Sequence, residues 1–406
     1  MKKVLGTILA ATMAFSLMAC GGNAGTQASQ AASEAASQAA EAVSEAAEAV
    51  SEAAAEVSEA AQEVVSDGTV QVGIVLPTME EPRWLQDQAQ FEALLGDAGF
   101  TSEVMFSGGN VATERANVDS LVTKGAQVII ICAHDGAAAG AAVADAKADG
   151  VTIIAYDRLI TDTDAVDYYV TFDSVSVGEA QAQYLVDHAP AGTGIPLYLY
   201  AGAASDNNAF LFFEGAWNVL QPKIADGTYV VQNSDKAVEL KDTATLSREE
   251  MSSIIEQITT NWSFDDASKL ANANLTAGGA EKGDVLVLAP NDGTARAIAD
   301  AFADDADVTS YVVSGQDAEK ASVQYIIDGK QSMTVFKDTR TLAKDSVDMA
   351  VAILNGQTPQ TGASYNNGAI DVPAKQTDVV AVDADNVKAA LIDSGYYDAS
   401  EFTGLD

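Results

Sequence analysis

Several apolar segments of the sequence are followed directly by charged or amide side chains, the groups that bind or transform small polar molecules. Segments that we predict to be β-strands are followed by Asp157, Arg158, Asn291, Gln316, Asp317 and Lys337. Arg83 and Trp84 follow the first strand, at the start of a predicted helix. Because ligands of open α/β sheets bind beyond the carboxyl ends of the strands, we expect these side chains to surround one site. A polar turn would explain each of them separately, so their joint occurrence is what predicts the site.

The residue types suit a ligand with several hydroxyl groups. A hydroxyl both donates and accepts hydrogen bonds, and this set offers carboxylates that accept, cations that donate and amides that do both. The indole of Trp84 suits the C–H face of a ring, although a core residue at the start of a helix is the plain alternative. The pattern therefore predicts a binding site for a small polyol such as a sugar.

Catalytic, metal and nucleotide sites have little support in the sequence. It contains no Gly-x-Ser-x-Gly motif, and Cys132 and His134 lack further ligands at zinc spacing. The segment 108–110, Gly-Gly-Asn, does not have the form of a phosphate-binding loop. Asp157 and Asp317 are a conceivable glycosidase pair, but both suit pairing with arginine or hydroxyl groups better. We expect a protein that is not an enzyme and that uses no metal and no cofactor.

The charge of the chain limits its partners. The formal net charge is −38 at pH 7, which argues against nucleic acid and against binding to an anionic membrane through a basic surface. Such a charge also suppresses self-association, and we expect a monomer.

Beyond residue 69, short apolar runs alternate with amphipathic stretches. The predicted strands are 70–76, 128–133, 152–156, 168–172, 196–200, 284–289, 310–314 and 333–336. The predicted helices are 84–95, 113–124, 137–149, 177–188, 247–260, 294–303 and 341–354. This alternation predicts a doubly wound α/β fold, and several strands are apolar throughout, as parallel strands covered on both faces are. The strands are too many for one sheet in a chain of this size, so two Rossmann-like lobes are expected.

The N-terminal residues predict export. Lys2 and Lys3 precede an apolar stretch, 4–18, which is short for a membrane span. The residues 17–20, Leu-Met-Ala-Cys, resemble the lipobox of a bacterial lipoprotein, which implies a signal peptide over 1–19 and a lipid on Cys20. The alternative is an ordinary signal peptide with an incidental cysteine. The resemblance to a lipobox implies a protein on the outer face of the cell membrane, held there by its lipid anchor alone.

Residues 20–67 have the composition of a tether. Alanine, glutamate, serine, glutamine and valine dominate, and a seven-residue unit recurs with one valine per repeat, which is a thin seam for a coiled coil. As a helix, some forty residues would extend about 60 Å. After removal of the signal peptide, Cys132 is the only cysteine besides Cys20, and it lies in an apolar run typical of a buried core.

Four ordered motifs identify a resemblance. They are Tyr-Asp-Arg-Leu-Ile at 156–160, Asp-Asn-Asn-Ala-Phe at 206–210, Val-Ser-Gly-Gln-Asp-Ala-Glu at 313–319 and Phe-Lys-Asp-Thr-Arg at 336–340. The segments 366–368 and 372–373 also fit. With them the chain resembles the periplasmic-binding-protein type I family, most closely the xylose-binding and multiple-monosaccharide-binding proteins of sugar ABC transporters. The resemblance covers about residues 70–400.

The resemblance implies two Rossmann-like lobes joined by three hinge crossovers, with the ligand in the cleft between them. The first lobe would comprise 68–173 plus 338–363, and the second 174–337 plus 364–406. By similarity the ligand-binding residues are Arg83, Trp84, Asp157, Arg158, Asn208, Asn291, Asp317 and Lys337. The relatives also place a second aromatic ring over the sugar, but the matching segment 245–250 has none, and Trp262 is the candidate to replace it.

The resemblance implies a substrate-binding protein that captures a monosaccharide of the xylose, glucose, galactose or arabinose class. It would close around the sugar and deliver it to the permease subunits of an ABC transporter. The main alternative is a receptor of the same fold for another small polar ligand, such as a nucleoside or a furanosyl signal. A sugar-responsive transcriptional regulator shares the core but lacks a signal peptide, and a secreted carbohydrate-active enzyme is the third alternative.

Overall fold

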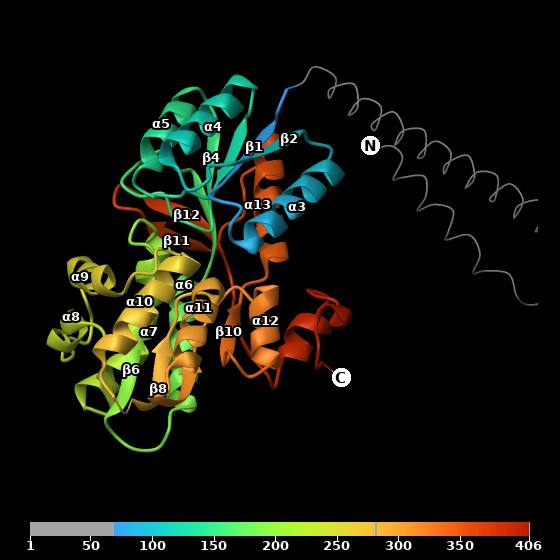
Figure 1. Ribbon diagram of the computed structural model, residues 1–406. Helices are drawn as coiled ribbons and strands as arrows, with labels where there is room; N and C mark the ends of the chain where they lie inside the picture. Colours follow the sequence, from blue (N-terminus) through green and yellow to red (C-terminus); the bar gives the residue numbers. More distant parts are fainter. Residues whose placement is uncertain (1–68, 281, 406) are drawn as a thin grey trace, which may run out of the picture. The chain divides into compact units, whose positions relative to one another are not determined.

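The computed structural model describes residues 69–280 and 282–405 of the chain (Figure 1). The predicted signal peptide (1–19), lipid attachment at Cys20 and tether (20–67) lie outside the described residues. Helices and strands alternate along the described part, where no helix is long and apolar enough to cross a membrane. The described chain forms two α/β lobes, which confirms the predicted fold class.

The first lobe is built on a seven-stranded sheet with the order β11-β12-β5-β4-β3-β1-β2. Its strands run parallel except β11, which pairs antiparallel with β12 at the edge. The strands are β1 (Val72–Leu76), β2 (Ser102–Phe106), β3 (Val128–Ile131), β4 (Thr152–Tyr156), β5 (Tyr168–Phe172), β11 (Ala363–Asn366) and β12 (Asp371–Thr377).

Alternate residues of these strands fill two separate cores, because successive side chains of a strand point to opposite faces of the sheet. Ile129 and Ile131 pack in the core under α4 and α5, whereas Ile130 packs in the core under α3 and α13. The two pairs of helices cover opposite faces of the sheet (Figure 1). These helices are α3 (Pro82–Asp97), α4 (Val111–Thr123), α5 (Ala139–Ala148) and α13 (Thr339–Leu354).

The second lobe has a parallel four-stranded sheet with the order β7-β6-β8-β9. Helices α6, α7 and α9 cover one face of it, and α10 and α11 cover the other. The strands are β6 (Ile195–Leu199), β7 (Tyr229–Val231), β8 (Gly283–Leu288) and β9 (Val308–Val313). The helices are α6 (Ser174–Asp187), α7 (Asn207–Ala225), α8 (Asp235–Glu239), α9 (Arg248–Ile258), α10 (Phe264–Ala277), α11 (Asp292–Asp304) and α12 (Lys320–Ile327).

A two-stranded antiparallel sheet, β10 (Met333–Phe336) with β13 (Val380–Asp383), extends the second lobe beyond β9. The C-terminal segment packs on it with the π-helical turn Lys388–Ile392 and the 3-10 turn Ala399–Glu401. The chain crosses between the lobes three times, from β5 to α6, from β10 to α13 and from β12 to β13.

One predicted boundary between the lobes is wrong. We assigned residues 364–406 to the second lobe, but β11 and β12 belong to the sheet of the first, where β12 pairs with β5. The last crossing therefore comes after Thr377, and the tail joins the second lobe through β13. The polar strands β11 and β12 carry no apolar pattern that would reveal a pairing about 200 residues away in sequence.

Two glycines let α6 and α7 approach closely, and a substitution there has a large expected effect. A Cβ on Gly178 would lie 1.8 Å from the carbonyl oxygen of Phe212, and one on Gly215 would lie 2.0 Å from that of Val175. We expect Gly178→Ala to force the helices apart and to lower the free energy of unfolding by about 3 kcal/mol, at the upper end for overpacking. Thermal unfolding measures this, with Gly96→Ala as the control because its Cβ would meet nothing within 4 Å. Equal melting temperatures for the two variants would contradict the close approach.

Candidate functional site

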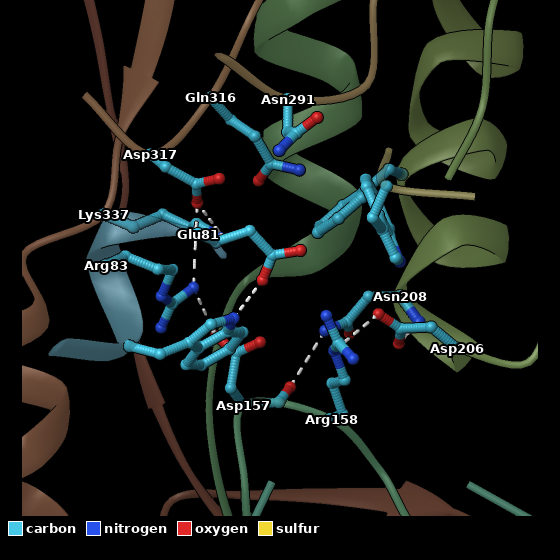
Figure 2. Close-up of a pocket in the computed structure, with 13 residues that line it drawn as sticks. Glu81, Arg83, Asp157, Arg158, Asp206, Asn208, Asn291, Gln316, Asp317 and Lys337 are labelled. Carbon is cyan, nitrogen blue, oxygen red and sulfur yellow. Dashed lines mark hydrogen bonds and ion pairs between the residues drawn. The ribbon is translucent and has the colours of Figure 1, made fainter. Parts of the chain in front are cut away.

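A cavity of about 360 Å³, counting the part open to solvent, is lined by residues from both lobes (Figure 2). The structure brings all eight predicted residues together in its wall: Arg83, Trp84, Asp157, Arg158, Asn208, Asn291, Asp317 and Lys337. Five further residues complete the lining: Gln316, which we expected beside the site, Trp262, the candidate second aromatic ring, and the unpredicted Glu81, Asp206 and Phe212.

The local structure explains why these side chains face one space. Arg83 and Trp84 lie in the first turn of α3, which begins at Pro82, a residue well suited to the first helical position. Asp206 and Asn291 are N-caps of α7 and α11, and each side chain accepts a hydrogen bond from a backbone N–H of its helix. Asp157 and Arg158 follow β4, Gln316 and Asp317 follow β9, and Lys337 follows β10, whereas Glu81 and Asn208 lie at the N-termini of α3 and α7. The carboxyl ends of strands and the N-termini of helices together form the wall.

A chain of ion pairs crosses the cavity from one lobe to the other. Arg83 Nη1 lies 3.0 Å from Asp157 Oδ2 in its own lobe and 3.7 Å from Asp317 Oδ1 in the second. Asp317 Oδ1 lies 2.7 Å from Lys337 Nζ, on the segment that links β10 to α13. Arg83 is also paired with buried Asp87, at 3.3 Å. Arg83, Asp87, Asp157 and Lys337 are buried and the side chain of Asp317 is only 9% exposed, so each charge needs the neighbour that compensates it.

A second ion pair crosses the lobes on the Arg158 side of the cavity. Arg158 Nε lies 3.0 Å from Asp206 Oδ2, and Arg158 Nη1 donates a hydrogen bond to the carbonyl oxygen of Ala133. Burial raises the pKa of Asp206, although Arg158 and the N–H of Asn208 act in the opposite direction. Arg83 and Arg158 both lie over the indole of Trp84, with guanidinium carbons 4.2 and 5.4 Å from the ring centroid.

The backbone of Asp157 has a left-handed conformation, with φ at 61°. Its carbonyl oxygen accepts hydrogen bonds from Tyr169 Oη at 2.7 Å, Thr171 Oγ1 at 3.3 Å and Asn208 Nδ2 at 2.9 Å. These three bonds hold an unusual conformation in place. Burial disfavours the charged carboxylate, but the nearby Arg83, Lys337 and Arg158 outweigh it and hold the pKa of Asp157 below its usual value.

Glu81 lies in the wall directly before α3, and no motif pointed to it apart from its nearness to Arg83. Its carboxylate accepts a hydrogen bond from the indole N–H of Trp84. Burial raises the pKa of Glu81, while Arg158 and this hydrogen bond lower it in part. Trp84 is 2% exposed and also packs in the core under α3, so it is a core residue and a wall residue together.

Trp262 supplies a second indole to the wall. It follows α9 in the segment before α10, where Asn261 and Trp262 have φ of 53° and 59°. Its ring lies against the backbone of Gly202 and contacts Phe212 edge-on, with 6.3 Å between the ring centroids. Trp262 Nε1 and Gln316 Oε1 are buried and have no hydrogen-bond partner in the described part of the chain. Such groups cost free energy unless a ligand or water pairs with them.

Comparisons with known proteins identify the family. The family model for the periplasmic binding protein domain matches residues 72–358. The multiple sugar-binding periplasmic receptor of Rhizobium radiobacter is 34% identical over 343 residues, which cover 81% of this chain and 91% of the receptor. The chain belongs to the periplasmic binding protein family.

Two solved structures agree with this assignment. The carbohydrate transporter solute-binding protein from Chloroflexus aurantiacus, in complex with D-glucose, is 65% identical with a TM-score of 0.81, over 83% of this chain and 99% of that one. An ABC transporter solute-binding protein from Clostridium phytofermentans with bound β-D-glucose is 34% identical with a TM-score of 0.73, over 82% and 99%. The resemblance predicted from the sequence is confirmed, and this periplasmic binding protein belongs to a family of binding proteins, not enzymes.

Glu114 gives this binding protein a pH-dependent stability. It is 1% exposed, and its Oε2 accepts hydrogen bonds from the His134 N–H at 2.8 Å and Ser107 Oγ at 3.4 Å. Its Oε1 is buried and has no hydrogen-bond partner among the residues that the structure describes. Burial raises the pKa of Glu114 from 4.5 to about 7, despite these hydrogen bonds. The raised pKa belongs to the folded state, whereas the unfolded chain keeps the ordinary value of 4.5. The contribution of Glu114 to the free energy of unfolding is therefore fully present below about pH 4.5 and is lost as the pH rises through about 7.

We expect Glu114→Gln to remove this contribution, which corresponds to about 3 kcal/mol between pH 4.5 and 8. Unfolding by urea at a series of pH values measures the change, and the variant should vary less with pH than the natural chain. Glu256→Gln on α9 is the control, because Glu256 is exposed. An unchanged pH dependence in Glu114→Gln would mean that its carboxyl is not the responsible group.

Proposed function

We propose that this protein captures a neutral monosaccharide between its lobes and passes it to the permease of an ABC transporter. The expected ligand is an aldose of the glucose, xylose, galactose or arabinose class, with D-glucose as the first candidate. The observation that carries the proposal is the composition of the cavity wall, which combines two indoles with cations that are each paired with a carboxylate of the wall.

The pairing of the cations with carboxylates favours a neutral ligand. The wall has the four carboxyl groups of Glu81, Asp157, Asp206 and Asp317, and it has the three cations of Arg83, Arg158 and Lys337. Each cation is already paired with a carboxylate of the wall. A phosphate or carboxylate on the ligand would have to displace one of these pairs at a large desolvation cost. The hydroxyl groups of a sugar can form hydrogen bonds with the paired carboxylates and guanidinium groups without breaking the ion pairs.

The rings and amides favour a sugar. Trp84 and Trp262 offer faces for the C–H surface of a pyranose, and Asn208, Asn291 and Gln316 offer amides for its hydroxyl groups. Two solved relatives carry bound glucose, and one of them is 65% identical to this chain. These observations support an aldohexose as the first candidate ligand.

We assign the ligand contacts by lobe. Arg83, Trp84, Asp157 and Arg158 would bind from the first lobe, with Lys337 at the crossing from β10 to α13. Asn208, Asn291 and Asp317 would bind from the second lobe. Because each lobe offers part of the hydrogen bonds, the closed arrangement binds the sugar best and the sugar shifts the population toward it.

Titration calorimetry on residues 67–406 tests the proposal. D-glucose, D-xylose, D-galactose and L-arabinose are compared with adenosine, ribofuranosides and glucose 6-phosphate. We expect at least one aldose to bind at micromolar concentration or below, with glucose 6-phosphate much weaker. Binding of a nucleoside or furanoside without any aldose would overturn the sugar assignment in favour of a receptor for another polar ligand.

We also propose that Cys20 carries a lipid and that 20–67 tethers the binding lobes to the outer face of the membrane. The lipobox-like residues 17–20 support this. Expression of the full chain in a bacterium fed labelled palmitate, followed by detergent phase separation, tests it. The natural chain should carry label and enter the detergent phase, whereas Cys20→Ala should not. Label on the Cys20→Ala chain would refute the anchor.

A further inference from the structure

The C-terminal segment contacts both lobes through two adjacent tyrosines. Tyr396 and Tyr397 pack against the small core of the second lobe that contains Phe336 and Ala318. Both hydroxyl groups also reach Gln86 on α3 of the first lobe. Tyr396 Oη donates to Gln86 Oε1 at 3.2 Å, and Gln86 Nε2 donates to Tyr397 Oη at 3.4 Å.

Tyr397 supports the turn that presents Asp317. Its hydroxyl donates a hydrogen bond of 3.0 Å to the carbonyl oxygen of Ala318. Asp317 and Ala318 are consecutive non-glycine residues in the left-handed region, with φ of 98° and 50°. Two such residues in sequence are costly unless surrounding contacts hold them. The hydrogen bond from Tyr397 is one of these contacts, and it lies next to the carboxylate that pairs with Lys337.

Tyr396 supports the segment that presents Lys337. Its ring meets Phe336 edge-on, with 4.7 Å between centroids, and its hydroxyl lies 3.2 Å from Thr339 Oγ1. The guanidinium of Arg340 lies over the same ring, 4.9 Å from its centroid. The tyrosine therefore contacts the crossing from β10 to α13 on both sides of Lys337.

Gln86 connects these two tyrosines to the helix that presents Arg83. The two residues are three positions apart on α3, which places them on one side of the helix. The amide of Gln86 thus joins the two segments that contain Asp317 and Lys337 to helix α3, which contains Arg83 and Trp84. Within the described part of the chain, none of Gln86, Tyr396 and Tyr397 lines the cavity.

We propose that Gln86, Tyr396 and Tyr397 form a latch between the lobes that stabilises the closed arrangement and positions Asp317 without touching the ligand. This inference rests on the proposed function. If binding requires the closed arrangement, the apparent dissociation constant rises as the closed fraction falls. The latch then sets affinity from outside the cavity, through the population that is ready to bind.

The test uses Gln86→Met, Tyr397→Phe and the double variant, with D-glucose as the probe. Met retains the length and helix propensity of Gln but makes no hydrogen bond, and Phe retains the ring. We expect each single variant to weaken binding about fivefold, the scale of one neutral hydrogen bond, mainly through faster dissociation. The double variant should lose less than the product of the single losses, because both substitutions break the same contact.

Tyr311→Phe is the matched control. Tyr311 Oη donates to the carbonyl oxygen of Lys330 at 2.9 Å, and Tyr311 is not part of the cavity wall. This control loses a tyrosine hydrogen bond to a carbonyl group, as Tyr397→Phe does, and it should bind the sugar as the natural chain does. Circular dichroism confirms that the latch variants fold.

Small-angle X-ray scattering of the sugar-free chains gives an independent reading. We expect Gln86→Met and the double variant to have a larger radius of gyration than the natural chain, because the lobes separate more often. If Gln86→Met and the double variant release the sugar at the rate of the natural chain and have its radius of gyration, the latch proposal is wrong. If the natural chain binds no sugar, the proposed function fails, and the scattering still decides whether the latch exists.

Discussion

Asp157→Asn should weaken the binding of D-glucose by more than a hundredfold, or about 3 kcal/mol. The side chain keeps its size, and asparagine tolerates the left-handed backbone that residue 157 adopts. What is lost is the charge 3.0 Å from Arg83 Nη1. A hydrogen bond to a charged group contributes about 1.5–3 kcal/mol, and the buried guanidinium is left with weaker compensation.

The fold should survive this substitution. The carbonyl oxygen of residue 157, not its carboxylate, accepts the hydrogen bonds from Tyr169, Thr171 and Asn208. Titration calorimetry measures the affinity, and thermal unfolding checks the structure. Asp119→Asn on α4 is the control, because the side chain of Asp119 is 58% exposed and does not line the cavity. An Asp157→Asn protein that binds glucose within threefold of the natural chain would remove Asp157 from the site.

The sequence predicted many of the strands because several of them are nearly continuous apolar runs. β3 has the sequence Val-Ile-Ile-Ile and is buried at every position, as a strand covered by helices on both faces must be. The polar residues that follow such strands were then placed by topology alone. This is why Asp157, Asp317 and Lys337, which lie far apart in sequence, could be predicted to meet in one cavity.

Phe212 was missed because α7 itself was not predicted. Its residues are apolar on several sides: Phe213 and Trp217 pack in the core beneath the four-stranded sheet, whereas Phe212 packs against Val177 and the wall of the cavity. A helix buried on more than one side shows no clear amphipathic period. Asp206 was visible as the first residue of a motif, but only the structure shows that capping α7 points its carboxylate at Arg158.

Trp262 marks the limit of what a pattern can predict, because its place depends on two residues with left-handed backbone and on a glycine about sixty positions earlier. We noted it only as a possible replacement for an aromatic residue absent from segment 245–250. The latch tyrosines near the C-terminus were not predicted for a similar reason. Gln86 lies in the other lobe and Ala318 lies 79 positions before Tyr397, and no local spacing encodes such contacts.

Trp262→Ala should weaken glucose binding by about ten- to a hundredfold. The variant removes an aromatic face from the wall and an indole N–H that has no partner in the described part of the chain. Loss of the ring contact and of one hydrogen bond together corresponds to about 1.5–3 kcal/mol. Trp262→Phe keeps a ring but loses the N–H, so its affinity should fall between those of the natural chain and the alanine variant. Calorimetric titration of both variants separates the two contributions.

Gly202→Ala tests the same ring without removing it. A Cβ at position 202 would lie 2.0 Å from Trp262 Cζ2, so the indole must leave its place in the wall. Gly362→Ala, whose Cβ would meet nothing within 4 Å, controls for the change of residue type. If Trp262 stacks on the sugar, Gly202→Ala should match the loss of Trp262→Ala and Gly362→Ala should bind normally. If Gly202→Ala and Trp262→Ala both bind glucose like the natural chain, the sugar rests on Trp84 alone and the second indole serves only the packing against Phe212.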